Sequence, residues 1–323
     1  MAVYFEELKD YEGLGRALKI YNEHIELAAL LEKGPRIIHL SVPGGKNIFG
    51  IAPEMAEKLP NGKTWNIMGG HRVWHSPEAY PRSYMSDNEP LARYEVLIDG
   101  IRLIQAEEEW THIQKIIEVH LKDDRVLVKN TLRNRGAWPV EMAVWSLTVG
   151  SRNGREVLPV TQRNTGLLPN TFYVSWPYSR LNDPRVKWGQ RYIIVENDPA
   201  DKTAFKFGYP NELGWMAYFN HEQCFIKKNA FKKGEQYPDL GCSWETYTSY
   251  WGVELECLDP LYTVKPGKEI TMHEEWFIFG DMAKPDADED AVAAALAGIA
   301  DKAEIELPVV SDVVWDPNFE EEE

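Results

Sequence analysis

Short runs of alternating apolar and polar residues recur along most of the chain, which is the pattern of β-strands. In VEMAVWSLTV, residues 140–149, Met142 and Val144 fall on one side, and Trp145 and Leu147 fall on the other. Both sides of this strand are apolar, so we expect it to be covered on both faces. The segments at 110–121 and 126–132 have the same period and are separated by KDDR, which has the length of a hairpin turn.

The same alternation, bounded by glycine or polar turns, predicts further strands along the chain. They lie at residues 17–22, 24–31, 35–41, 92–98, 100–108, 191–196, 204–207, 214–220, 223–229, 242–248, 252–258 and 270–279. Because there is hardly any helical pattern before residue 285, the sequence predicts an all-β fold made of an antiparallel double sheet.

The end of the chain has a different pattern. DADEDAVAAALAGIADKAE, residues 286–304, is rich in alanine and opens with acidic residues suited to a helix N-terminus. The acidic run that ends the chain is most simply a solvated end. We therefore predict a β-sandwich over residues 1–283 and a short helical, acidic C-terminal tail over residues 284–323.

Charge and composition narrow the class of partner. The 35 basic residues against 51 acidic ones give a net charge of −16, which disfavours nucleic acids and anionic membranes and favours a neutral small molecule. The three cysteines have no CxxC spacing, so neither a disulfide framework nor a zinc knuckle is expected. The N-terminus lacks a secretory pattern, and no apolar run approaches about 18 residues, so we expect a cytoplasmic protein.

A dense group of polar and aromatic residues stands out in WNIMGGHRVWHSPEAYPRSYMSDNEP, residues 65–90, which has neither helical nor strand periodicity and is interpreted as a loop. Trp74, Tyr80 and Tyr84 are costly to expose, whereas Arg72 and Arg82 resist full burial. A half-buried cleft wall satisfies both kinds of residue. Sugar sites have this composition, since aromatic faces stack on C–H groups while guanidinium and carboxylate groups bind hydroxyls. The alternative is a surface loop rich in hydrogen-bonding groups.

The spacing of His71 and His75 is one that zinc enzymes use on a helix, but here no metalloprotease glutamate lies between them and two prolines follow. A metal site is therefore disfavoured, and we predict no cofactor.

A second group lies at residues 235–261. On a strand over 252–258, Glu254 and Glu256 point to the same face about 7 Å apart. Glu245 alternates in the same way on the preceding strand. Aromatic neighbours would desolvate these carboxylates and raise their proton affinity, as a general acid or base requires; the alternative is a solvent-facing strand with ordinary surface acids.

Lys206, at the end of an aromatic strand, either reaches into a cleft or lies over apolar surface with its ammonium group in water.

Several of these segments resemble the galactose mutarotase-like group, most of all its aldose-epimerase-related branch. The similar stretches are GGHRVWHSPEAYPRSY, AVWSLTV with LP following at 158–159, YPDLGCSWETYT and VELECLDPLYTVKPGKEITMHEEWFIF, together with IYNEHIELAALLEKGPRIIHLSVPGGKNIFG near the start. The resemblance covers roughly residues 17–280. It implies a β-supersandwich with a sugar cleft on a concave sheet face.

The resemblance also implies roles for particular residues. Glu256 matches the family's glutamate base, with Glu254 as the alternative, and Arg72 matches an arginine that binds sugar hydroxyls. The chain departs from the family at WSLTVGSRNG, residues 145–154, which lacks the mid-chain histidine that serves as the acid. Because ring opening needs both a base and an acid, either His71 or His75 substitutes, or the protein is not a standard mutarotase.

Two functions follow from this interpretation: a carbohydrate epimerase acting on an aldose or sugar acid, or a non-catalytic carbohydrate-binding protein with the same fold. Glycoside cleavage is less favoured, because Glu254 and Glu256 are too close along one strand to flank a single bond. The predicted catalytic residues are Glu256, His75 and His71. The predicted substrate-binding residues are Arg72, Trp74, Glu78, Arg82, Lys206, Asp239, Glu245 and Glu254.

Overall fold

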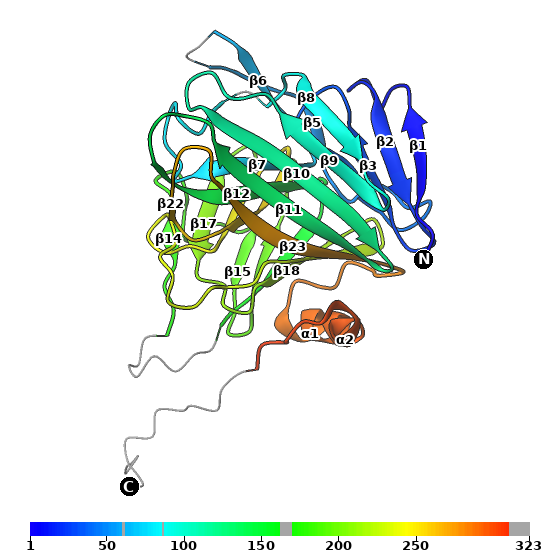
Figure 1. Cartoon of the computed structure of the whole chain (residues 1–323). Helices are drawn as coiled ribbons and strands as arrows, with labels where there is room; N and C mark the ends of the chain where they lie inside the picture. The colour runs from blue at the N-terminus through cyan, green and yellow to red at the C-terminus, as the bar shows by residue number, and fades with distance from the viewer. Residues whose placement is uncertain (60–61, 86, 162–169, 310–323) are drawn as a thin grey trace, which may run out of the picture.

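A computed structural model describes residues 1–59, 62–85, 87–161 and 170–309 of the chain. Two large antiparallel sheets lie face to face, and a short helical segment packs outside one of them (Figure 1). This confirms the predicted all-β fold with a short C-terminal helix. In the described ranges, no helix is long and apolar enough to cross a membrane.

The first sheet has the strand order β1-β2-β3-β4-β7-β12-β21-β20-β17-β14, and β22 pairs with β12. Its strands are β1 (Tyr4–Leu8), β2 (Ala17–Tyr21), β3 (Glu26–Leu30), β4 (Ile37–Ser41), β7 (His71–Ser76), β12 (Val140–Gly150), β14 (Val174–Ser175), β17 (Phe205–Tyr209), β20 (Trp244–Ser249), β21 (Gly252–Leu258) and β22 (Tyr262–Val264). Strands distant in sequence, such as β7, β12 and β21, therefore lie side by side at its centre.

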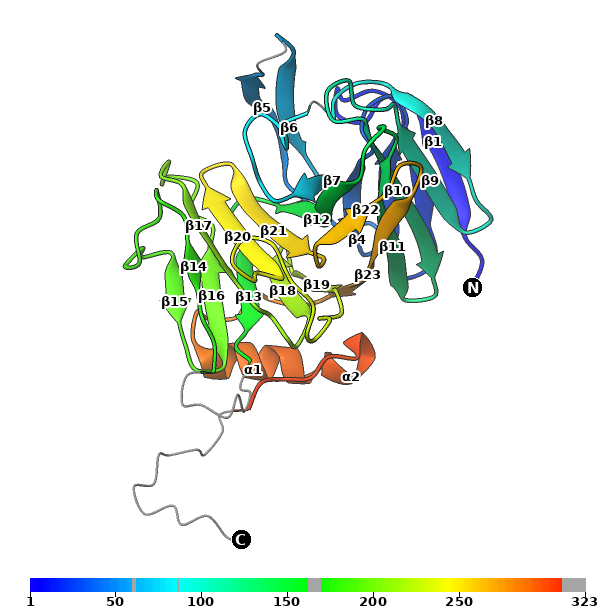
Figure 2. The same cartoon turned by 60° about the vertical axis from the view of Figure 1, so that its left-hand side comes forward.

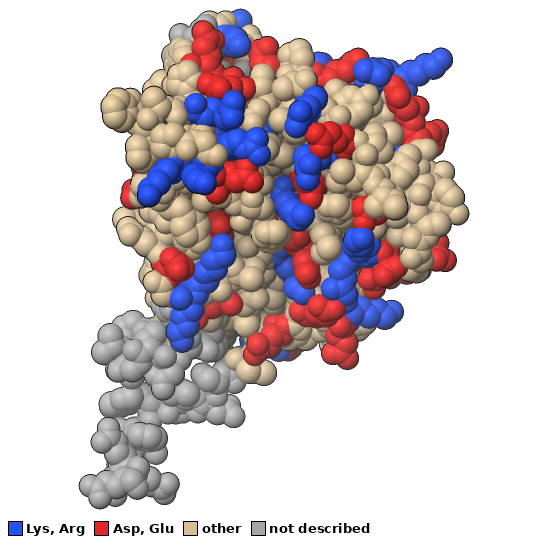
Figure 3. All heavy atoms as spheres, viewed as in Figure 1, with Lys and Arg blue, Asp and Glu red and all other residues tan. Residues whose placement is uncertain are grey.

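The second sheet has the order β15-β16-β13-β18-β19-β23-β11-β10-β9-β8. Its strands are β8 (Leu91–Val96), β9 (Gly100–Gln105), β10 (Ile113–Lys122), β11 (Arg125–Asn134), β13 (Arg155–Pro159), β15 (Val186–Trp188), β16 (Tyr192–Glu196), β18 (Trp215–Asn220), β19 (Gln223–Lys228) and β23 (Glu269–Gly280). Its outward face carries basic and acidic side chains side by side (Figure 3), as in the Arg102–Glu118 and Arg133–Glu269 ion pairs.

The main apolar core lies between the sheets, and a second apolar cluster lies on the opposite face of the first sheet. Strand β12 contributes to both, since Met142 and Val144 pack in the core while Trp145 and Leu147 pack in the second cluster. This arrangement agrees with the apolar residues on both sides of that strand.

The interpretation of residues 65–90 as a loop is wrong for its first half. Residues 64–76 form β6 (Thr64–Gly69), which pairs with β5 (Ile51–Lys58), and the central strand β7. At Gly70, φ is 69° and a Cβ would lie 2.3 Å from the carbonyl oxygen of Ile37, so only glycine allows this close approach. Every residue of β7 is buried, which removes the apolar–polar alternation that marks a one-sided strand.

The C-terminal helices α1 (Glu289–Ala297) and α2 (Ala300–Ala303) cover the outside of the second sheet, below β13, β16 and β18 in Figure 2. Val292 and Leu296 are fully buried there in one cluster with Trp215 and Phe219. Asp288 caps the first helix by accepting hydrogen bonds from two backbone N–H groups. The predicted acidic end of the chain falls in 310–323, outside the described residues.

We predict that Leu296→Ala lowers the free energy of unfolding by ~2–5 kcal/mol, because it leaves a cavity beneath α1. Urea unfolding monitored by tryptophan fluorescence measures the change. Leu181→Ala is the matched control, since that side chain is 73% exposed and its loss should cost less than about 0.5 kcal/mol. Equal stability of the two variants would contradict tight packing of the helix.

Candidate functional site

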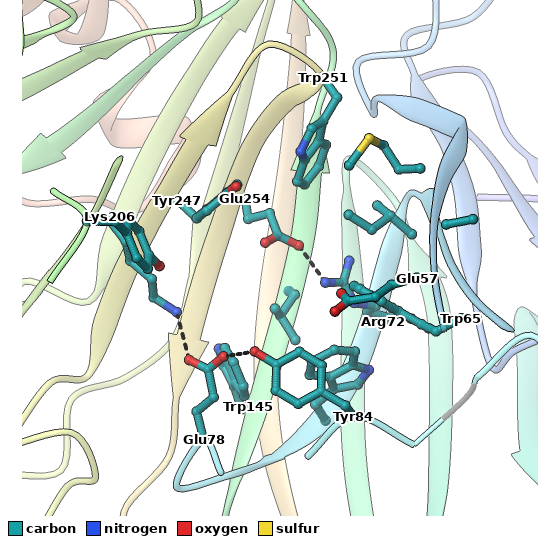
Figure 4. Close-up of a pocket in the computed structure, with 16 residues that line it drawn as sticks. Glu57, Trp65, Arg72, Glu78, Tyr84, Trp145, Lys206, Tyr247, Trp251 and Glu254 are labelled. Atoms are coloured by element: carbon teal, nitrogen blue, oxygen red, sulfur yellow. Dashed lines mark hydrogen bonds and ion pairs between the residues drawn. The ribbon is translucent and has the colours of Figure 1, made fainter. Parts of the chain in front are cut away.

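A cavity of about 350 Å³ opens on the face of the first sheet that is turned away from the second sheet (Figure 4). The central strands form its floor, and the β5–β6 hairpin contributes one wall. Its lining residues are Met55, Ala56, Glu57, Trp65, Ile67, Arg72, Trp74, Glu78, Tyr84, Trp145, Leu147, Tyr178, Lys206, Tyr247, Trp251 and Glu254. The cavity thus combines many aromatic rings with a few charged groups, as ligand sites do.

Arg72 and Glu254 meet in this cavity although 182 positions separate them in sequence. Strand β12 lies between β7 and β21, and the Arg72 Nη2 atom donates to Glu254 Oε1 across it at 2.5 Å. The guanidinium carbon lies 4.9 Å from the centre of the Trp74 ring and 5.7 Å from that of Trp65. Its Nε and Nη1 atoms have no hydrogen-bond partner among the described residues.

Lys206 is the second cation of the cavity and is 3% exposed. Its Nζ atom lies 2.8 Å from Glu245 Oε2 and 3.0 Å from Glu256 Oε2. Glu78 Oε2 is 3.8 Å away, which is too far for a hydrogen bond. The ammonium also lies 4.7 Å from the ring centres of both Trp145 and Trp176, a distance that permits cation–π attraction.

Burial changes the acidity of these groups. Desolvation raises the pKa of Glu245 well above its usual range, and nearby Glu256 raises it further, although Lys206 opposes the rise. Desolvation likewise raises the pKa of Glu256, and that of half-buried Asp239. Burial alone would lower the pKa of Lys206, but Glu245 and Glu256 outweigh it and raise that pKa well above its usual range. Both carboxyls therefore bind a proton more tightly than an exposed carboxyl does, and so does the amine of the lysine beside them.

Glu254 and Glu256 do share one face of β21, but they lie at different depths. Glu254 lines the cavity, whereas Glu256 is fully buried behind it. The indole Nε1 of Trp145 donates to Glu256 Oε2 at 2.8 Å, beside the contact with Lys206. Trp74 and Glu78 also line the cavity, and Glu245 lies beneath Lys206.

The structure contradicts the expectation that His71 or His75 lies over these acids. Neighbouring residues of a strand point to opposite faces, so both histidines point away from Arg72 and Trp74 toward the second sheet. His71 contacts Thr148 Oγ1 at 2.8 Å and Asn130 Oδ1 at 2.9 Å, and burial lowers its pKa to about 4.

The ring of His75 is also buried, and its Nε2 atom lies 3.7 Å from Glu108 on the core side. Burial lowers its pKa as well. Neither imidazole reaches the cavity.

Two other predicted substrate-binding residues lie outside the cavity. Arg82 donates to the backbone carbonyl of Glu141 at 2.9 Å, and Asp239 accepts from Ser76 Oγ at 3.3 Å beside a neighbouring hollow. In the described part of the chain, no group of three or more His, Cys, Asp or Glu residues is arranged to hold a metal ion.

Several wall residues were not predicted. Trp145 was visible as an apolar position on β12, and Tyr247 alternates with Glu245 on β20. Tyr178 follows the short β14 in a segment without periodicity, so no sequence pattern indicated it.

An antiparallel two-sheet sandwich with this cavity places the chain among large β-sandwich proteins, and comparison with solved structures identifies the type. A putative aldose 1-epimerase from Klebsiella pneumoniae aligns with a TM-score of 0.59 at 13% identity, over 93% of this chain and 87% of that one. A galactose mutarotase-like protein from Lactobacillus casei aligns with a TM-score of 0.50 at 11% identity, over 81% of this chain and all of the other. The chain has the galactose mutarotase-like fold.

A TPR-domain containing protein from Parabacteroides distasonis is also similar, with a TM-score of 0.54 and 14% identity over 91% of this chain. The chain spans only 56% of the length of that protein. No protein-family model and no curated protein sequence matches the chain.

The raised pKa of Glu245 predicts a pH-dependent effect of Glu245→Gln. A carboxyl whose pKa is higher in the folded than in the unfolded state stabilises the fold below its unfolded pKa and loses this contribution as pH rises toward its folded pKa. Glu245→Gln has no carboxyl at this position, so its stability does not fall with rising pH for this reason. Its stability relative to wild type should therefore increase by at least ~1 kcal/mol between about pH 5 and about pH 8, since one pKa unit corresponds to about 1.4 kcal/mol.

Urea unfolding at the two pH values measures this change. Glu6→Gln serves as the control because Glu6 is exposed, and its effect should be the same at both pH values. A pH-independent effect of Glu245→Gln would show that the Glu245 carboxyl ionises normally.

Proposed function

We propose that the cavity binds a carbohydrate and catalyses exchange of its anomers, as an aldose 1-epimerase does. The observation that carries this proposal is the convergence of a wall carboxylate, Glu254, and two buried cations, Arg72 and Lys206, on one aromatic cavity. The fold it shares with a protein named as a putative aldose 1-epimerase supports the same reaction class.

The lining suits a sugar ring. Indole and phenol faces cover its C–H surfaces, while charged groups bind its hydroxyls. Two guanidinium nitrogens of Arg72 have no hydrogen-bond partner among the described residues; they are desolvated donors, and the Trp65 and Trp74 rings hold the guanidinium in place. Hydroxyl oxygens of a ligand would satisfy them, which lowers the cost of burying the guanidinium.

Ring opening needs a base at the anomeric hydroxyl and a donor at the ring oxygen. We assign the base to Glu254, because it is the β21 carboxylate that lines the cavity, and we assign Glu256 the role of holding Lys206 in position. An ammonium has three donors, and Glu245 and Glu256 occupy two. The third is left for the ring oxygen, where the positive charge stabilises the developing alkoxide.

In ring opening Lys206 gives a proton to the ring oxygen while Glu254 takes the proton of the anomeric hydroxyl, and both protons return to these groups when the ring closes; Glu245 and Glu256 hold the ammonium in place throughout. This arrangement supplies the acid function for which the sequence offers no mid-chain histidine. The base, Glu254, and the proton donor, Lys206, are thus two different residues, each with its own surroundings, as acid–base catalysis requires.

Glu254→Gln should reduce catalysed anomer exchange by ~100- to 10,000-fold, because it removes the base without changing the shape of the side chain. NMR exchange spectroscopy across several aldoses measures the rate. Glu235→Gln, at an exposed loop position, is the control and should exchange sugars at the wild-type rate. An unaffected Glu254→Gln rate together with a strong loss in Glu256→Gln would instead assign the base to Glu256.

A second candidate is a non-catalytic carbohydrate-binding protein. It is favoured because both carboxylates of β21 already accept hydrogen bonds from the protein. Arg72 donates to Glu254, and both Trp145 and Lys206 donate to Glu256. In that case calorimetry on the wild-type protein would show sugar binding, while NMR would show anomer exchange at the uncatalysed rate.

A further inference from the structure

A second hollow of about 440 Å³ adjoins the cavity. Residues 174–178, Asp239 and Leu240 line it, and it shares Glu78, Tyr84 and Tyr178 with the cavity. We call this hollow the outer compartment. Because these three side chains belong to both linings, the outer compartment and the cavity meet at Glu78, Tyr84 and Tyr178.

The chemistry of the outer compartment is that of a neutral sugar site. Trp176, Tyr84 and Tyr178 present aromatic surface, and the carboxylates of Glu78 and Asp239 accept hydrogen bonds. No Lys or Arg is among its described lining residues. Hydroxyl groups can donate to such acceptors, whereas a phosphate or carboxylate placed there would meet the like charge of Glu78 and Asp239.

Apolar surface around the outer compartment is left in water. Leu240 is 85% exposed and Tyr178 is 48% exposed. Tyr80 is 66% exposed, and its ring centre lies 5.8 Å from that of Tyr84. Covering these side chains with a ligand removes apolar surface from water and so lowers the free energy of the complex.

The direction of the ligand follows from the two carboxylates drawn in Figure 4. Glu254 projects from β21, and Glu78 lies toward another side of the cavity, where Tyr84 donates to it. If Glu254 acts at the anomeric carbon, the opposite end of the ring lies toward Glu78 and the outer compartment. A sugar linked through that end keeps its anomeric hydroxyl free.

We propose that the protein acts on a reducing disaccharide or longer oligosaccharide, with the reducing ring in the cavity and a second, uncharged ring in the outer compartment. This inference rests on the proposed function, because it takes the cavity to be the site of the reducing ring.

Calorimetry tests the inference with glucose, galactose and mannose against 1,4- and 1,6-linked disaccharides in which each of them is the reducing ring. At least one disaccharide should bind ~10-fold or more tightly than its reducing-ring monosaccharide, a ratio equivalent to about 1.4 kcal/mol of added contact. Trp176→Ala should reduce this ratio to below about 2-fold, because Trp176 is the largest aromatic surface of the outer compartment. A constant ratio in Trp176→Ala would overturn the inference.

Leu240→Ala tests the same compartment without touching the cavity lining. It should weaken disaccharide binding by ~2- to 5-fold, because part of the added apolar contact is lost, while monosaccharide affinity stays at the wild-type value. Ile98→Ala is the matched control, since Ile98 is 92% exposed in the turn between β8 and β9 of the other sheet. It should change neither affinity.

The results separate this inference from the proposed function. Anomer exchange without any disaccharide preference overturns the two-ring inference and leaves the proposed function standing. A disaccharide preference without catalysed exchange supports the two-ring site and overturns the proposed catalysis. Failure of all these sugars to bind overturns both.

Discussion

The buried ammonium group of Lys206, on β17 next to the edge strand β14, allows two carboxyl groups to be buried side by side in the first sheet. Glu245 and Glu256 are directly opposite each other on neighbouring strands, where two like charges repel and destabilise the sheet. Both carboxyls are almost fully buried, so solvent does not screen them. Lys206 lies between them within hydrogen-bonding distance of each. Removing it would leave two carboxyl groups buried without a cation in a region of low dielectric constant.

The same constraint explains why the two cations lie among aromatic rings. The cavity face of β12 is packed with Trp145 and Leu147, so groups reaching it are desolvated. Guanidinium and ammonium groups tolerate this position because ring faces attract them while carboxylates bind them from the other side. The guanidinium and ammonium groups are oriented and desolvated before a ligand enters. Under this condition, fixed charges act most strongly on a reacting bond. We infer that stability and reactivity of the site have the same electrostatic origin.

The strands whose apolar and polar residues alternate could be predicted from the sequence, and so could the shared face of Glu254 and Glu256, because both depend on local periodicity alone. Strand β7 could not, since it is buried on both sides and carries charged or imidazole groups on each. Which of its two faces meets the cavity is decided by pairing with β12, some 75 residues later. A shift of one residue would exchange Arg72 for His71. The misplacement of the histidines and the unpredicted depth of Glu256 both follow from this dependence on long-range register.

The missing mid-chain histidine has a physical consequence that extends beyond this site. An imidazole is a convenient acid because its ordinary pKa lies near neutrality, but the reaction requires only a proton donor held against the ring oxygen. Burial and the neighbouring Glu256 move the pKa of Glu245 upward, while Lys206 opposes this rise. Burial and charged neighbours therefore move the pKa of Glu245 and that of Lys206 away from their ordinary values. We infer that a chain with the galactose mutarotase-like fold can place a proton donor in its cavity without that histidine.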